Sequence, residues 1–346
     1  VMVWIHGGGH QTGSGSNEYY QSNSLTQRGV VLVTLNYRLG LIGYLAHPAL
    51  SGESQHGVSG NYGTLDQIAA LRWVRENIAS FGGDPGNVTI FGESAGGESV
   101  AHMLASPLAR GLVHRAIMQS ASSGGLLIHR ERPVLSFLSA EAAGEAFAEQ
   151  AVETDRDRIE GLRAMSLDQL DAALQRYPKI GTYTYPIVDG YVLPKSVMET
   201  FLDGDQAPVP LMVGSNSDEG SILYSLGNAA LYGSSPGPKT ADEYPRYLRG
   251  AQGADAEKIL ELYPAPDDAS VFDAVSAVYG DSRFGAPARF YAKQMAAVGQ
   301  PAYLYFFTRG PPSPSQTAGA FHAAEIVFVF DKSVPLFPTD EQDQVI

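Results

Sequence analysis

The segment Gly92-Glu-Ser-Ala-Gly96 places a hydroxyl between glycines, after an apolar run and before a helical pattern. In such a strand-to-helix turn the serine hydroxyl is exposed, and the glycines keep side chains from colliding across the turn. The first amides of the following helix point toward the place where an oxyanion would form. The bare pattern is weak evidence in a sequence with 38 glycines. Its strand and helix context favours Ser94 as a nucleophile over a chance match.

A run of three glycines follows His6, at the end of the first apolar run. Successive glycines allow backbone N–H groups to converge on an oxyanion without obstruction by side chains. We therefore expect Gly8, Gly9 and Ala95 to supply an oxyanion hole, although a simple glycine turn gives the same pattern. His6 and His10 are four residues apart, but the glycines between them disfavour the helix that a metal site would need.

A general base must come from the eight histidines, at positions 6, 10, 47, 56, 102, 114, 129 and 322. Hydrolases with this serine turn place the nucleophile first in the chain, then the acid, then the histidine. His102, His114 and His129 follow Ser94 too closely for a strand carrying the acid to intervene. His322 comes just after the last predicted strand and is therefore the predicted base.

The acid that would orient this histidine is less certain from the residues alone. Asp218 and Glu219 follow an apolar strand pattern, where a carboxylate could orient and stabilise an imidazole. Composition does not separate these two neighbours. Asp189 and Asp281 are further candidates, and either could be a structural acid in a turn.

Strand patterns alternate with helical patterns along the chain. Helices are predicted over Leu65–Ser80, where apolar residues recur every three to four positions, and over Ala95–Ala105. Such alternation predicts a mostly parallel sheet covered by helices on both faces. The predicted strands are Val1–Ile5, Val30–Asn36, Val88–Phe91, Ala116–Gln119, Pro210–Gly214 and Ala302–Phe307.

Two long stretches, residues 122–208 and 221–300, interrupt this alternation with charged helical segments. We interpret them as insertions that pack over one edge of the sheet, within a single domain of residues 1–346. The first residue already lies in a strand pattern, and the last segment has no recognisable terminus. We therefore expect the chain to be the central part of a longer sequence.

The composition excludes several classes of site. The sequence has 37 acidic and 23 basic residues, a net charge of −14, and no basic run of the kind that binds nucleic acid. Its apolar runs are far shorter than the ~20 residues that span a bilayer. Without cysteine there is no thiol nucleophile, disulfide or cysteine-bound metal. We expect no metal, cofactor or membrane span, and leave the oligomeric state and the compartment open.

The segment Phe81-Gly-Gly-Asp-Pro-Gly-Asn-Val-Thr-Ile-Phe-Gly-Glu-Ser-Ala-Gly96 resembles the active-site signature of the type-B carboxylesterases. That family includes cholinesterases and bile-salt-activated lipases. Further motifs recur in the family order, so the resemblance runs from residue 1 to about residue 330. These motifs are Asn36-Tyr-Arg38, Gly60-Asn61, Leu65-Asp66-Gln67, Pro186-Ile-Val-Asp-Gly190 and His322-Ala-Ala-Glu325.

The resemblance implies an α/β-hydrolase fold, and it places the acid of the triad at Glu219 rather than Asp218. It also implies a buried network of hydroxyl and carboxylate groups beside the triad. The members of that network would be Glu93, Ser120, Asp281 and His322. An acid beside the nucleophile can influence the charge of the imidazole, although an ordinary buried acid is an equal reading of Glu93.

The expected substrate pocket departs from that of the cholinesterases. The matching positions carry Ile180, Thr182, Ile222 and Leu223, and a position near Leu127 lacks the tryptophan of the cholinesterase gorge. A site for choline needs aromatic faces. We therefore expect an aliphatic pocket of the bacterial or fungal general-esterase type. Four aromatic residues could also line it, although core packing is the default for each: Tyr183, Tyr185, Tyr224 and Phe284.

The sequence therefore predicts a serine carboxylic-ester hydrolase that forms an acyl-enzyme on short-to-medium uncharged acyl esters. One alternative is a non-catalytic binding module, because the family contains adhesion members that lack the serine. Another is a true lipase, which would need a lid that cannot be recognised in the sequence. The physiological ester stays open.

Overall fold

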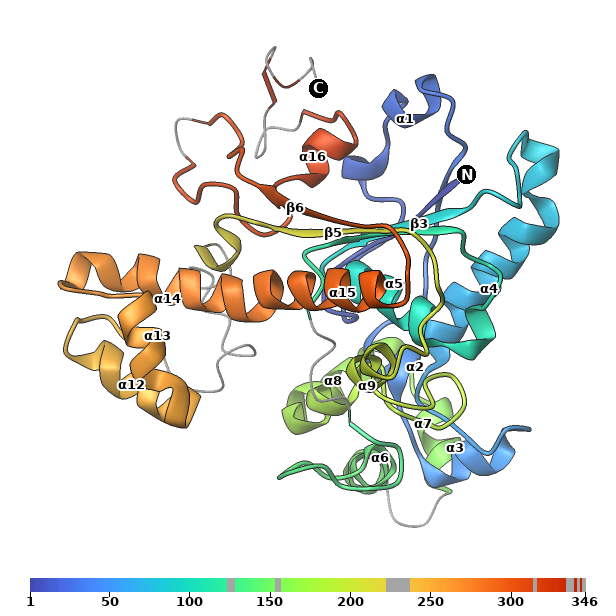
Figure 1. Cartoon of the computed structure of the whole chain (residues 1–346). Helices are drawn as coiled ribbons and strands as arrows, with labels where there is room; N and C mark the ends of the chain where they lie inside the picture. The colour runs from blue at the N-terminus through green and yellow to red at the C-terminus, as the bar shows by residue number, and fades with distance from the viewer. Residues whose placement is uncertain are drawn as a thin grey trace.

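The computed structural model describes residues 1–122, 128–152, 157–221, 237–313, 316–333, 339–340 and 343. Its centre is a sheet of six parallel strands in the order β2-β1-β3-β4-β5-β6 (Figure 1). The strands are β1 (Met2–Ile5), β2 (Leu32–Thr34), β3 (Thr89–Glu93), β4 (Arg115–Gln119), β5 (Leu211–Asn216) and β6 (Ala302–Phe307). All six predicted strands are therefore confirmed, with shifts of at most two residues at their ends.

The strands are apolar on both faces because helices cover both faces. Val3 and Ile5 of β1 pack into the largest core cluster, whereas Trp4 between them packs with Phe91 and Phe330 on the other side. This is the period of two that a strand imposes on its side chains. At the edge of the sheet, β6 leaves apolar side chains partly open: Tyr303, Leu304 and Phe306.

The helices that contribute most to the largest core cluster are α4 (Tyr62–Asn77), α5 (Ala95–Ala105) and α15 (Ala286–Ala297). The predicted helix over Leu65–Ser80 is α4 followed by a 3₁₀ turn at Ile78–Phe81. On the opposite face lie α1 (Ser24–Gln27) and α16 (Ile326–Val329) (Figure 1). Short 3₁₀ segments occur at Glu18–Tyr20 and Pro107–Ala109, and two short helices that the sequence did not suggest are α2 (Gly40–Tyr44) and α3 (Pro48–Glu53).

The first long stretch, between β4 and β5, is mostly helical. Its helices are α6 (Ala140–Ala151), α7 (Arg158–Arg163), α8 (Leu167–Arg176), the 3₁₀ segment Pro178–Tyr183 and α9 (Val197–Leu202). The helices α6, α7 and α8 build a core cluster of their own around Phe147 and Leu162. By contrast, Phe201 of α9 packs into the core beneath the sheet.

The second stretch, between β5 and β6, differs from the prediction at its end. Its elements are α12 (Glu243–Gln252), 3₁₀ segments at Gly253–Asp255 and Asp268–Ser270, α13 (Ala256–Leu262), α14 (Val271–Gly280), a π-helical turn at Asp281–Gly285, and α15. The helices α12 to α14 form a separate cluster, but Tyr291 of α15 is buried against the sheet (Figure 1). Only the first part therefore resembles an insertion, because α15 covers the sheet between β5 and β6. The single-domain interpretation stays a prediction.

Candidate active site

Ser94 occupies the sharp turn between β3 and α5. Its backbone is strained, with φ 57° and ψ −124°, a conformation that side chains rarely adopt. The turn is held by two backbone hydrogen bonds, one from the amide of Ser94 to Gln119 and one from the amide of Glu98 to Ser94, each 2.9 Å. A Cβ added at Gly96 would lie 2.0 Å from the carbonyl oxygen of Ile5. Glycine is therefore required there for the helix to approach β1.

The triple-glycine loop that follows β1 reaches Ser94. A Cβ added at Gly7 would lie 3.2 Å from Cβ of Ser94, so the loop passes directly beside this serine. Gly8 and Gly9 have φ of 105° and 62° and are exposed, and space is open around the Cα of Gly9. The loop can therefore present amides to a substrate next to Ser94. This position agrees with the predicted oxyanion hole, which the α5 amide of Ala95 would complete.

His322, before α16, is held by Glu219, after β5. Nδ1 of His322 lies 2.6 Å from Oε2 of Glu219. The other oxygen of Glu219 accepts hydrogen bonds from the hydroxyl of Ser120, at 2.5 Å, and from the amide of Asn216, at 2.8 Å. Glu219 is only 1% exposed. The carboxylate therefore has a fixed orientation, with one oxygen facing the imidazole.

The neighbouring acids have structural partners instead. Asp218 accepts hydrogen bonds from the hydroxyl of Ser217, at 2.5 Å, and from the amide of Ala320, at 3.0 Å. It thereby joins the end of β5 to the loop that carries the histidine. Asp189 accepts three backbone N–H groups within its own turn. The geometry separates Glu219 from both alternatives, which composition alone did not do.

Two further carboxylates surround the imidazole. Oε1 of Glu93 lies 3.2 Å from Nε2 of His322, and no hydrogen bond joins the Ser94 hydroxyl to His322 in the described part of the chain. Glu325 is buried and accepts hydrogen bonds from the side chains of Gln119, at 3.0 Å, and Asn216, at 2.6 Å. Sequence reasoning assigned Glu325 no role, although it is the last residue of the His-Ala-Ala-Glu motif.

This concentration of acids changes the protonation of the site. Burial lowers the pKa of His322, but the charges of Glu93, Glu219 and Glu325 outweigh burial and raise the pKa to about 9. Burial first, then Glu325 and Glu219, raise the pKa of Glu93 to about 8. The imidazolium is thus stabilised strongly, as a base that accepts a proton from serine requires.

Phe284 and Asp281 differ from their expected roles. The ring of Phe284 stacks on the imidazole of His322 with a centroid distance of 4.7 Å. It is buried like a core residue and places an apolar ring directly against the imidazole. Asp281 is exposed, and its carboxylate accepts a hydrogen bond from the hydroxyl of Tyr263 at 2.6 Å. Its predicted place in the buried network is wrong, because its position on the π-helical turn directs it to Tyr263.

The predicted pocket residues are only partly placed. Ile180 is 5% exposed within the cluster formed by α6, α7 and α8, so it packs in a core rather than lining open space. Thr182 is exposed. The hydroxyl of Tyr183 accepts a backbone N–H from Leu138 at 3.0 Å, and Tyr185 packs its ring edge against His10. Four predicted positions lie outside the described residues: Leu127, Ile222, Leu223 and Tyr224.

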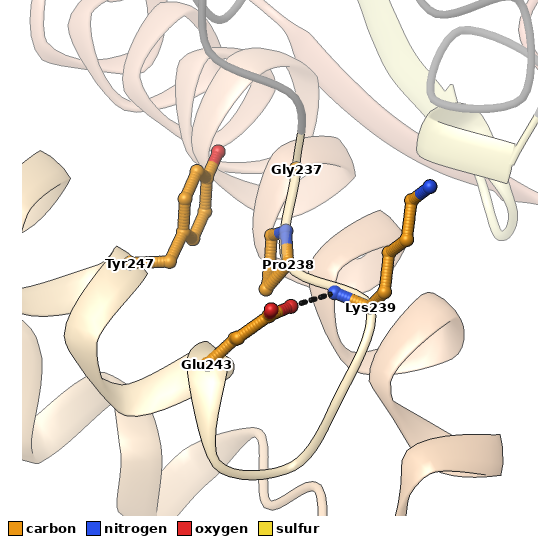
Figure 2. A pocket seen from close by; sticks show the side chains of 5 residues that line it. All are labelled: Gly237, Pro238, Lys239, Glu243 and Tyr247. Atoms are coloured by element: carbon orange, nitrogen blue, oxygen red, sulfur yellow. Dashed lines mark hydrogen bonds between the residues drawn. The ribbon is translucent and has the colours of Figure 1, made fainter.

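A pocket of about 380 Å³ lies elsewhere, at the start of α12. In Figure 2 the carboxylate of Glu243 points to the backbone N–H of Lys239, 2.8 Å away. None of the site residues lines this pocket, whose remaining walls are Gly237, Pro238 and Tyr247. Within the described ranges there is also no cluster of three metal-ligating side chains, and no helix is both long and apolar enough to cross a membrane.

A parallel sheet that presents a serine at a strand-to-helix turn, beside a histidine bound to a carboxylate, defines the α/β-hydrolase class. The solved structure of PNB esterase has this fold and superposes with a TM-score of 0.77 at 33% identity, covering 99% of this chain and 69% of that one. The chain belongs to the carboxylesterase family, whose family model matches residues 1–346. The predicted fold class and family are therefore confirmed.

Two relatives show how the chain compares with longer proteins. The fumonisin B1 esterase of Sphingopyxis macrogoltabida is 40% identical over 336 residues, which cover 95% of this chain and 57% of the relative. The para-nitrobenzyl esterase of Bacillus subtilis (strain 168) is 35% identical over 337 residues, covering 95% and 63%. The chain thus spans about three fifths of the length of these relatives.

Proposed function

We propose that this protein hydrolyses carboxylic esters through an acyl-enzyme on Ser94. The observation that carries the proposal is the imidazole of His322, which lies between Glu219 and the turn that bears the serine. Membership of the carboxylesterase family supports the same reaction. Proteins named as esterases are also similar to this chain over most of its length, and the para-nitrobenzyl esterase is one of them.

In the proposed mechanism the hydroxyl oxygen of Ser94 attacks the ester carbonyl carbon while Nε2 of His322 takes its proton. The carbonyl oxygen becomes an oxyanion, which the amides of Gly8, Gly9 and Ala95 stabilise. When the tetrahedral intermediate collapses, the bond to the alcohol breaks and the imidazolium protonates the leaving alcohol.

Water completes the reaction in the reverse sense. His322 takes a proton from water as the water oxygen attacks the acyl carbon. When this second tetrahedral intermediate collapses, the bond between the acyl group and Ser94 breaks, the imidazolium returns the proton to the Ser94 oxygen, and the carboxylic acid is released. Throughout both half-reactions Glu219 holds Nδ1 of the imidazole and stabilises its positive charge. The chemistry requires the Ser94 hydroxyl and Nε2 of His322 to come within hydrogen-bond distance, because Nε2 faces Glu93 in this structure.

For the substrate we propose short-to-medium uncharged acyl esters, without selectivity for choline. The support is Phe284 on the imidazole, together with Ile222 and Leu223, which the sequence predicts for the pocket and which lie outside the described residues. An apolar wall contributes about 25 cal/mol per Å² of buried apolar surface, whereas attraction of a quaternary ammonium ion needs several aromatic faces. The comparison of butyrylcholine with 3,3-dimethylbutyl butyrate at high salt tests this. A choline advantage above about tenfold would contradict it.

A chain-length series of p-nitrophenyl esters tests the activity, with the Ser94→Ala variant as the matched blank. We expect turnover that peaks at short or medium acyl chains and falls by about 10⁶-fold in the variant. Equal release of p-nitrophenol by both proteins would contradict catalysis and favour a binding module. An increase in rate only above the solubility limit of long-chain esters would favour a lipase.

A further inference from the structure

A polar cluster behind the oxyanion loop takes no part in the proposed reaction. Its members are His10, which follows Gly9 directly, Glu98 in the first turn of α5, and Ser122 after β4. Nε2 of His10 lies 3.3 Å from Oε2 of Glu98, and the hydroxyl of Ser122 donates to the other oxygen of Glu98. One carboxylate thus joins the start of α5 to two other segments of the chain.

The oxyanion loop needs an anchor because its backbone is strained. Gly8, Gly9 and His10 have three successive positive φ values, the last at 57° on a residue that carries a side chain. Gly8 and Gly9 are exposed, whereas His6 and His10 on either side of them are each only 1% exposed. The two buried histidines therefore fix the ends of a loop whose centre faces the substrate.

Each end of the loop is held in a different way. His6 stacks on Tyr37 with a centroid distance of 4.6 Å, and the hydroxyl of Tyr37 donates to the carbonyl of His6 at 2.9 Å. Among the residues that the structure describes, the ring of His10 meets other rings at their edges or at a tilt, with centroids 5.6 to 6.3 Å away. These rings belong to Tyr37, Tyr44, His102 and Tyr185. The directed contact of His10 is therefore Glu98.

The charges in the cluster suit this contact. Burial would raise the pKa of Glu98, but His10 and the Ser122 hydroxyl overcome it and lower the pKa to about 2, so Glu98 is ionised. The neighbouring His102, one turn further along α5, has its pKa lowered to about 3 by burial and by His10. It is therefore neutral and does not compete for the carboxylate.

We propose that the His10–Glu98 contact is a clasp that positions the oxyanion loop against the start of α5. Glu98 lies three residues after Ala95, and its backbone amide binds the carbonyl of Ser94. The clasp therefore sets the distance between the amides of Gly8 and Gly9 and the amide of Ala95. His10 and Glu98 are positioning residues, and their role rests on the proposed esterase function.

The test measures kcat and KM for p-nitrophenyl butyrate in two variants, His10→Phe and Glu98→Gln. The first keeps a ring of similar shape, and the second keeps an acceptor for Ser122. We expect kcat to fall about 10- to 100-fold in each, since a misplaced oxyanion donor weakens only the transition state, while KM changes less than about twofold. The double variant is expected to be no slower than the slower single variant, because both changes remove the same contact.

A matched control removes another ion pair. Glu53→Gln breaks the contact of Glu53 with Arg163, whose atoms lie 2.5 Å apart on the surface, and is expected to leave kcat unchanged. Glu98→Asp, which keeps the charge, is expected to recover part of the lost kcat. The rate of phosphonylation by a fluorophosphonate is expected to fall in parallel with kcat.

The outcomes separate the clasp from the proposed function. If the unaltered protein turns over esters but His10→Phe and Glu98→Gln lower only the melting temperature, the contact is structural and the clasp is wrong. Additive losses in the double variant would also overturn it. If the unaltered protein hydrolyses no ester, the proposed function fails first. Should either variant not fold, Ser122→Ala serves in its place, with an expected smaller loss in kcat at unchanged KM.

Discussion

Glutamates lie on both sides of Ser94, Glu93 buried and Glu98 partly exposed, and their surroundings differ. On the histidine side, Glu93 shares one imidazole with Glu219 and Glu325, and its pKa is raised to about 8. On the oxyanion side, Glu98 is the sole carboxylate between an imidazole and a hydroxyl, among the residues that the structure describes, and its pKa is lowered to about 2. The same side chain, five residues apart, therefore has opposite protonation preferences.

This difference shows that the two sides of the turn at Ser94 serve different purposes. Excess negative charge on the histidine side suits a group that gains and loses a proton during the reaction. On the oxyanion side, the contact between Glu98 and His10 suits groups that hold the geometry of the loop. The comparison predicts that changes on the histidine side alter the rate and its pH dependence, whereas changes on the other side alter geometry.

The largest effect is expected at Glu219. Its replacement in Glu219→Gln should lower kcat by about 10⁴-fold, because the imidazole loses its partner at Nδ1 and can adopt the wrong tautomer. The isosteric change Asp218→Asn serves as its control and should cost less than about tenfold, since Asp218 fixes the loop without touching the imidazole. Steady-state kinetics of both variants decide the matter. Similar losses of kcat in the two variants would show that Glu219 is not the acid of the triad.

A smaller effect is expected at Glu93. The imidazole of His322 must be neutral to accept the serine proton, so its raised pKa of about 9 places the acidic limb of the activity profile at alkaline pH. Removing the charge in Glu93→Gln lowers this pKa, and the limb of kcat/KM moves to lower pH. The plateau should fall about tenfold, because the imidazolium loses a stabilising charge. A limb that stays in place or moves upward would refute this role.

The two glutamates should also affect stability in opposite pH ranges. Glu98, with a pKa lowered from 4.5 to about 2, stabilises the fold above pH 4.5, and this contribution disappears as the pH falls toward 2. Glu93, with a pKa raised to about 8, stabilises the fold below pH 4.5 and loses that contribution as the pH rises through 8.

Urea unfolding of the two glutamine variants across pH measures this contrast. Glu98→Gln should cost about 1–3 kcal/mol at pH 7, and less in acid. Glu93→Gln should gain on the unaltered protein as the pH rises from 4.5 to about 8, because glutamine resembles the neutral acid and does not titrate. If the free energy of unfolding depended on pH in the same way in both variants, the two glutamates would not have opposite protonation preferences.

The smallest effect is expected at Asp281. Because its carboxylate is exposed and binds the hydroxyl of Tyr263, Asp281→Asn should change kcat by less than about twofold and stability by about 0.5 kcal/mol or less. Glu325→Gln is the buried counterpart and should shift the acidic limb of kcat/KM to lower pH. If Asp281→Asn shifted the acidic limb of kcat/KM more than Glu325→Gln does, Asp281 rather than Glu325 would be the acid that acts on His322.

The sequence predicted the parts of the molecule that depend on local pattern. Each of the six strands has an apolar run that a buried parallel strand requires, and the serine turn is a local motif with its own strand and helix. His322 followed from its order in the chain. The choice between Asp218 and Glu219 depended on resemblance, because adjacent carboxylates differ only in which one faces the imidazole.

Contacts between residues far apart in the chain could not be predicted from the sequence. Glu98 and His10 are 88 positions apart, and nothing in their spacing indicates that a helix start and a loop bring them within 3.3 Å. Asp281 was misplaced for the same reason, since the π-helical turn determines its direction. The role of α15 was also missed, because a helix that covers the sheet and one in an insertion have the same apolar pattern.

The most direct test of the account is the site of covalent modification by a fluorophosphonate, located by peptide mass spectrometry. We predict one adduct per chain, on the oxygen of Ser94, because only a serine activated by His322 beside an oxyanion hole attacks the phosphorus rapidly. Ser94→Ala should carry no adduct, and Glu219→Gln should acquire it much more slowly. An adduct on another residue, or equal labelling of Ser94→Ala, would contradict the assignment of Ser94 as the nucleophile.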